Sequence, residues 1–104
     1  MTDRITKLQS FLEQSPQDAF LQHALALEWI KAGNDGKALR LFEKLLAETP
    51  GYVGSYYHLA KLLERQGDVP AAVGWYEKGM EQARMAGDRH AYGELHSAWE
   101  ELTF

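Results

Sequence analysis

Residues 16–49 read PQDAFLQHALALEWIKAGNDGKALRLFEKLLAET, and residues 50–83 read PGYVGSYYHLAKLLERQGDVPAAVGWYEKGMEQA. When the second stretch is placed under the first, at an offset of 34, seven positions are identical: Pro16/Pro50, Leu25/Leu59, Ala26/Ala60, Gly33/Gly67, Ala38/Ala72, Glu43/Glu77 and Lys44/Lys78. Self-similarity at a fixed period of this length indicates a protein built from repeated structural units. We therefore interpret each stretch as one repeat.

Each repeat contains two segments whose apolar residues recur at three- and four-residue steps, which is the spacing of one helical face. In the first repeat these residues are Leu21, Leu25, Ala26, Trp29 and Ala32, and then Ala38, Phe42, Leu45 and Leu46. Between the two segments, Gly33 suits the positive φ of a helix C-terminus, and Asn34 or Asp35 suits the cap of the next helix. Gly67 and Asp68 mark the same turn in the second repeat. The pattern predicts two helices joined by a tight turn in each repeat.

The helical pattern continues on both sides of the repeats, with one apolar stripe before residue 16 and another after residue 88. We expect a half-repeat helix over 1–15, full repeats over 16–49 and 50–83 with the last helix running on to about residue 86, and a capping helix over 88–104. The predicted helices lie near 3–14, 17–32, 35–48, 52–66, 69–86 and 89–102. The expected fold class is all-α, a short right-handed α-solenoid of antiparallel helix pairs.

The composition excludes several classes of function. The 104 residues include 11 Lys and Arg against 15 Asp and Glu, a net charge of −4, which disfavours nucleic acid and anionic membranes as partners. The absence of cysteine rules out thiolate catalysis, disulfides and cysteine-based zinc sites. No apolar run has the length of a signal peptide or a membrane span, so the expected location is cytoplasmic. We expect no catalytic residue, cofactor or metal.

The 34-residue helical pairs resemble those of the tetratricopeptide repeat family. The resemblance rests on Leu-Ala in each first helix, on Gly-Asn or Gly-Asp at each turn, on Ala and then an aromatic residue in each second helix, and on the proline that closes the first repeat. These residues are Leu25-Ala26, Leu59-Ala60, Gly33-Asn34, Gly67-Asp68, Ala38, Ala72, Phe42, Tyr76 and Pro50. Two departures stand out. Gln22 occupies a position that is usually aromatic, and Leu45 and Gly79 replace a usual Ala.

The resemblance implies a non-catalytic adaptor that binds a peptide or a segment of another protein in a concave groove lined by the first helix of each repeat. Projected onto that groove, the candidate binding residues are Phe20, His23, Leu27, Tyr57, His58, Lys61, Arg65, Tyr92, His96 and Trp99. For Tyr92 and Trp99, packing within the cap stays open as an alternative. Members that grip a C-terminal carboxylate need Lys and Asn at positions that hold His23, Leu27 and His58 here, so we expect a different kind of segment.

Two other functions stay open. The terminal helices leave half a repeat exposed at each end, so a structural module that forms a homodimer through these helices is the main alternative. The pairs His90/Glu94 and His96/Glu100 have helical metal-ligand spacing but no third ligand in the sequence, which favours surface polar pairs. The loop from Gly33 to Lys37 lacks the spacing and the Ser or Thr of a phosphate-binding loop, and we interpret it as a turn.

Overall fold

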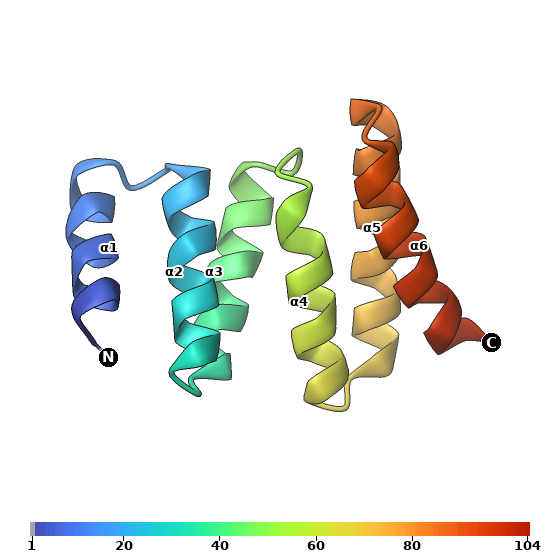
Figure 1. The fold of residues 1–104 in the computed structure, drawn as a ribbon, viewed down its shortest axis with the longest axis horizontal. Coiled ribbons are helices and arrows are strands. Elements are labelled where there is room, and N and C mark those ends of the chain that lie inside the picture. The colour runs from blue at the N-terminus through green and yellow to red at the C-terminus, as the bar shows by residue number, and fades with distance from the viewer. Residues whose placement is uncertain (1) are drawn as a thin grey trace. The chain divides into compact units, whose positions relative to one another are not determined.

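The computed structural model describes residues 2–104 of the chain, with side chains described from residue 3. These residues form six α-helices and no strand: α1 (Thr2–Gln14), α2 (Ala19–Lys31), α3 (Asp35–Glu48), α4 (Gly54–Arg65), α5 (Val69–Ala86) and α6 (Arg89–Thr103) (Figure 1). The helices divide into two compact units, residues 1–49 with α1 to α3 and residues 50–104 with α4 to α6. The predicted all-α fold class is confirmed. Met1 of the predicted half-repeat lies outside the described residues.

Short polar side chains set where four of the helices begin. Asp18, Asn34, Asp68 and Asp88 each accept a hydrogen bond from the backbone N–H three residues further on, at 3.0 to 3.2 Å. Such a bond satisfies one of the four amide groups that a helix start leaves without a partner. The Asp18 cap explains why α2 begins at Ala19, two residues later than the sequence analysis predicts.

The turns predicted at Gly33 and Gly67 follow the C-terminal ends of α2 and α4. These glycines have φ of 80° and 85°, in the left-handed region that side chains with a Cβ rarely adopt. Each turn therefore reverses the chain within three residues, and the two helices that it joins pack against each other, α2 on α3 and α4 on α5.

In unit 1, α2 packs on both α1 and α3. Ile5 and Leu8 of α1 form one buried cluster with Leu25 of α2, while Phe42 and Leu45 of α3 are fully buried. Gln22 is the polar exception, because its side chain is only 1% exposed. Its amide nitrogen donates to the carbonyl of Pro16 at 2.9 Å and to a carboxylate oxygen of Glu48 at 3.2 Å.

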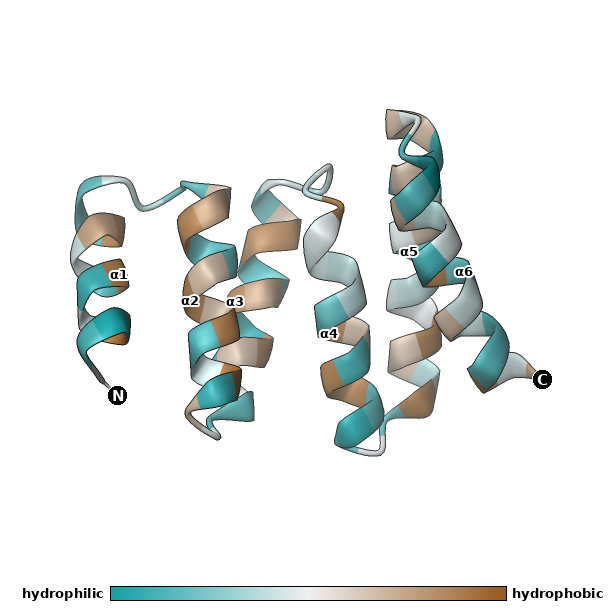
Figure 2. Ribbon diagram, in the orientation of Figure 1, coloured by the Kyte–Doolittle hydropathy of each residue, from teal (hydrophilic) through white to brown (hydrophobic). Residues whose placement is uncertain are grey.

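In unit 2, α6 packs on α5 and also touches α4. The core is built around Tyr76, Leu59 and Leu62, all fully buried, together with Leu95 of α6 at 1% exposure. Ala60 and Ala72, small residues expected at close helix contacts, are also fully buried. Hydrophobic and hydrophilic residues alternate along the helices, as in amphipathic helices that bury one face (Figure 2).

The two departures from the repeat pattern have a structural explanation. Tyr56, which is 34 residues after Gln22, donates its hydroxyl to the carbonyl of Pro50 at 2.6 Å, so both side chains bond the carbonyl of the proline six residues earlier. The larger Tyr56 ring lies directly against Gly79, where a Cβ would be 2.6 Å from the Tyr56 Cβ. In the first repeat the smaller Gln22 occurs together with the larger Leu45, which occupies the position of Gly79. We interpret each pair as filling a similar volume in its own repeat.

Candidate binding cavity

On α2 of unit 1, three side chains are predicted to contact a partner. Phe20 is 65% exposed, whereas His23 and Leu27 are half-buried. The His23 ring lies edge-on to the ring of Phe42 on α3, with centroids 5.8 Å apart. His23 is thus partly engaged within its own unit, and Phe20 has the largest surface free for contact with another molecule.

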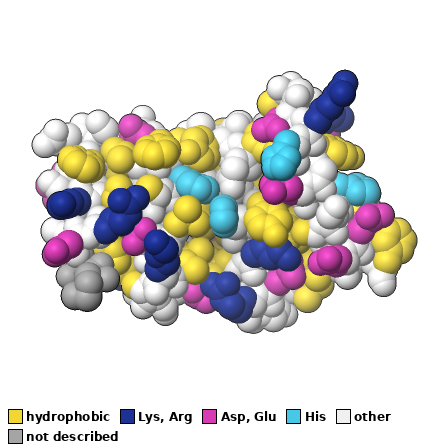
Figure 3. Space-filling model, viewed as in Figure 1, with side chains coloured by type: hydrophobic (Ala, Val, Ile, Leu, Met, Phe, Trp, Pro, Cys, Tyr) yellow, Lys and Arg dark blue, Asp and Glu magenta, His cyan; other side chains and the backbone are white. Residues whose placement is uncertain are grey.

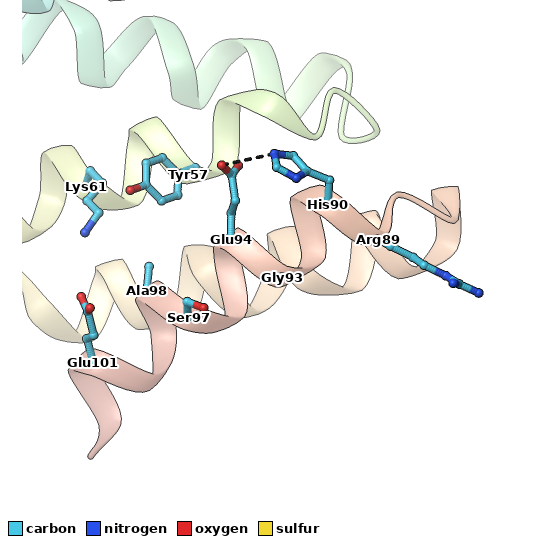
Figure 4. A pocket seen from close by; sticks show the side chains of 9 residues that line it. All are labelled: Tyr57, Lys61, Arg89, His90, Gly93, Glu94, Ser97, Ala98 and Glu101. Atoms are coloured by element: carbon cyan, nitrogen blue, oxygen red, sulfur yellow. Dashed lines mark ion pairs between the residues drawn. The ribbon is translucent and has the colours of Figure 1, made fainter.

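In unit 2, residues of α4 and α6 line an open cavity of about 620 Å³. Tyr57 and Lys61 line it from α4 and face the side chains of α6 (Figure 4). Residues from α6 complete the lining: Arg89, His90, Gly93, Glu94, Ser97, Ala98 and Glu101. The small residues Gly93, Ser97 and Ala98 lie at helical spacing on the side of α6 that faces α4, and they leave the space open.

A chain of contacts from the core positions Lys61 at this cavity. The Tyr76 hydroxyl donates to the carboxylate of Glu64, whose Oε2 is also 3.6 Å from the Lys61 ammonium. The ammonium lies 5.5 Å from the centroid of the Tyr57 ring, a cation–π contact. Burial, together with the Glu64 carboxylate, raises the pKa of Tyr76, so the hydroxyl keeps its proton and remains a donor.

Glu94 and His90 lie toward the other end of the cavity, whereas Glu101 lies opposite Lys61 (Figure 4). His90 Nε2 is 3.4 Å from Glu94 Oε2, the pair drawn with a dashed line in Figure 4. Burial lowers the pKa of the neighbouring His58, while the Glu94 charge partly opposes this shift. The cavity therefore offers a cation beside an aromatic ring at Lys61 and carboxylates at Glu94 and Glu101. Figure 3 shows acidic, basic and histidine side chains interspersed on one face of the molecule.

The remaining predicted residues lie outside this cavity. Arg65, at the end of α4, is exposed and does not line it. Tyr92, His96 and Trp99 form a row of rings along α6, with centroid distances of 5.9 Å and 5.5 Å between neighbours. The indole nitrogen of Trp99 donates to Glu77 of α5 at 3.0 Å. The side of α6 that carries this row is thus hydrogen-bonded to α5, and a different side of α6 faces α4.

Sequence reasoning missed the α6 residues that line the cavity, above all Glu94, Ser97 and Glu101. It selected the aromatic residues of α6 because large rings are frequent at protein interfaces. The signal that could have indicated the edge facing α4 is the set of small residues at 93, 97 and 98, since a helix side without bulky side chains can lie beside a neighbouring helix and still leave a cavity.

The histidine pairs of the sequence analysis are present as ion-pair contacts. His96 Nδ1 lies 3.7 Å from Glu100 Oε1, on the same helix as the His90 and Glu94 pair. Within residues 2–104, no group of three or more His, Cys, Asp or Glu side chains is arranged to hold a metal ion. Over the same residues, no helix is both long and apolar enough to cross a lipid bilayer.

Comparison with known proteins links the chain to characterised folds. A family model described as tetratricopeptide repeat matches residues 30–97. A tetratricopeptide repeat domain protein from Salinibacter ruber, solved by crystallography, is 42% identical, with a TM-score of 0.78 over 82% of this chain and 94% of that one. Its solution structure gives a TM-score of 0.81 at the same 42% identity, over 85% of this chain and 89% of that one. A protein from Bordetella parapertussis is 25% identical, with a TM-score of 0.82 over 98% of this chain and 89% of that one. No curated protein matches the chain.

Proposed function

The chain belongs to the tetratricopeptide repeat family, whose members generally bind proteins or peptides, and from this premise we propose that it binds a segment of another protein in the cavity between α4 and α6. The observation that carries the proposal is the pairing of Tyr57 with Lys61 at the wall of a cavity of about 620 Å³. An aromatic ring with a cation beside it is a frequent anchor at protein interfaces.

The charges at the cavity define which segments fit. The Lys61 ammonium suits an acidic side chain, and Glu94, which lies toward the other end of the cavity in Figure 4, suits a basic one further along the segment. An apolar side chain between the two would contact the Tyr57 ring. We therefore propose a bound segment with an acidic end, an apolar middle and a basic end, since matched charges fix the orientation in which a segment binds. In this function the protein acts as a non-catalytic adaptor.

The test begins with selection of binding peptides from a displayed random library against the whole chain. Affinities of the selected peptides are then measured by calorimetry for the wild type, for Tyr57→Ala combined with Lys61→Ala, and for Tyr92→Ala. We expect the double variant to weaken binding at least tenfold with unchanged helicity, and Tyr92→Ala to have little effect. If the double variant binds as tightly as the wild type, the cavity is not the binding site.

A second candidate function is self-association, and the row of rings on α6 favours it. Trp99 lies 6.3 Å from the Phe104 ring, and Phe104 is 92% exposed at the end of the chain. Burying such rings against the same surface of a second copy would give a symmetric dimer. Light scattering over a hundredfold range of concentration is the test. A mass that stays at 11.8 kDa would eliminate a stable dimer.

A further inference from the structure

A second cavity, of about 360 Å³, lies wholly within unit 1. Its wall on α3 carries three cations one helical turn apart, Lys37, Arg40 and Lys44. Leu25, Trp29 and Leu41 form the apolar part of the lining, and Gln9 of α1 completes it. No carboxylate lines this cavity, although the chain as a whole has a net charge of −4.

Among the described residues, two of the three cations have no carboxylate partner. Lys44 forms an ion pair with Glu48 at 2.9 Å. The Lys37 ammonium lies 4.4 Å from the centroid of the Trp29 ring and has no carboxylate partner among the described residues, and within the same part of the chain Arg40 has none either. A cavity with an apolar lining and two unneutralised cations is matched by a ligand that is apolar and acidic.

The second repeat gives an internal control for the role of these residues. At the offset of 34, the second repeat has Ala71 at the position of Lys37, Gly74 at the position of Arg40 and Leu63 at the position of Trp29. The α4–α5 pair nevertheless forms the same turn and the same kind of core as the α2–α3 pair. The basic cluster is therefore not needed to build the repeat, and its presence in one repeat alone points to a function.

We propose that this cavity binds an acidic segment of a partner protein, at a site separate from the cavity of unit 2. The Arg40 guanidinium binds a carboxylate through two parallel hydrogen bonds, a geometry that lysine does not offer. Lys37 binds a second carboxylate of the segment, and an apolar side chain between the two contacts Leu25 and Leu41. The chain then holds two segments, or two parts of one partner, at different sites.

The test uses a fluorescein-labelled peptide of sequence Glu-Glu-Leu-Glu-Glu-Phe, with a control peptide in which lysine replaces every glutamate. Binding to the whole chain is measured by fluorescence polarisation at low salt. We expect the acidic peptide to bind and the basic one not to bind. Arg40→Gln should weaken binding about threefold, and Lys37→Gln combined with Arg40→Gln about tenfold, because each removes one charge-assisted contact at a solvent-accessible site.

Lys78→Gln is the matched control, since Lys78 lies 34 residues after Lys44, in unit 2, and its loss changes the net charge as much as Arg40→Gln does. It should leave the affinity of the acidic peptide unchanged. Equal weakening by Lys78→Gln and Arg40→Gln would overturn the proposal, because binding would then depend on net charge alone.

A second measurement does not depend on any variant folding correctly. In the amide and indole NMR spectrum of the wild type, the acidic peptide should shift the Trp29 indole signal and the amides of residues 37–44 most strongly. Largest shifts in unit 2 would overturn the proposal. The proposal would also be overturned if the peptide did not bind while phosphatidylserine vesicles or inorganic phosphate bound in a way that depended on Arg40. That result would assign the cavity to a different class of ligand.

Discussion

Substituting Gly79 by alanine tests how tightly α4 and α5 are packed in unit 2. A Cβ on residue 79 would lie 2.6 Å from the Tyr56 Cβ, 2.9 Å from its Cγ and 3.0 Å from a methyl group of Leu95. Carbon atoms prefer a separation of about 3.5–4.0 Å. The Leu95 methyl can rotate away, but the Tyr56 Cβ is attached to the backbone of α4. The added methyl group therefore forces the two helices apart.

Two opposing effects set the magnitude. Replacing glycine by alanine inside a helix stabilises it by about 1 kcal/mol, because alanine restricts the unfolded chain. Overpacking a filled core costs about 1–3 kcal/mol. We expect Gly79→Ala to lower the free energy of unfolding by about 1 kcal/mol, which for a chain of this size lowers the melting temperature by about 4–8 °C.

Gly74→Ala is the matched control, since Gly74 lies on the same helix and a Cβ there would have no atom within 4 Å. It should raise stability by up to about 1 kcal/mol. The difference between the two variants, about 2 kcal/mol, is measured by urea unfolding followed by circular dichroism. If Gly79→Ala proves as stable as Gly74→Ala, the close contact with Tyr56 is wrong, and so is our explanation of why this repeat has glycine at that position.

Three further predictions concern single features of the two units. Gln22→Tyr should lower stability by about 1–3 kcal/mol, because in the first repeat Leu45 fills the space that, in the second repeat, Gly79 leaves open for Tyr56. Adding Leu45→Ala should restore most of the loss in urea unfolding. Tyr76→Phe should cost about 1 kcal/mol in the same assay, because it removes the hydroxyl that donates to the Glu64 carboxylate. Burial lowers the pKa of His58 in the folded state, so its contribution to stability is present at neutral pH, above the unfolded pKa of about 6.5, and is lost as the pH falls through the folded value. His58→Gln should therefore lose less stability than the wild type in thermal unfolding between pH 7.5 and pH 5; an equal loss would show that His58 does not contribute to the acid sensitivity.

Most of the helical architecture follows from local features of the sequence. The limits of α3 and α5 match the predicted 35–48 and 69–86, because a capping Asn34 or Asp68 marks each start. The glycines with positive φ occur at the predicted turns, since few other residues adopt that conformation at low cost. Capping and turn formation depend on residues a few positions apart, which is why one sequence suffices to predict them.

The candidate site was predictable only in part. Tyr57 and Lys61 line the cavity as the projection onto the groove indicates, because their helix follows the repeat period closely. The residues predicted on α6, namely Tyr92, His96 and Trp99, do not line it. Helix α6 begins 35 residues after α4, the same interval as from α2 to α4, but its buried residues are Leu95 and Ala98, whereas the period of 34 places Gly93 and Glu94 at the positions of the buried Leu59 and Ala60. The repeat period therefore left the orientation of α6 undefined.

The sequence by itself therefore determined the number of helices, their turns and the family of the fold, since each depends on contacts within one helix or between neighbours in the chain. Only the tertiary structure decided which edge of α6 faces α4, how the buried amide of Gln22 is bonded, and that three cations of α3 share one cavity with Trp29. Adjacent residues of a helix point about 100° apart, so a small rotation against the neighbouring helix exchanges the side chains that line a cavity. That rotation is set by packing between segments distant in sequence.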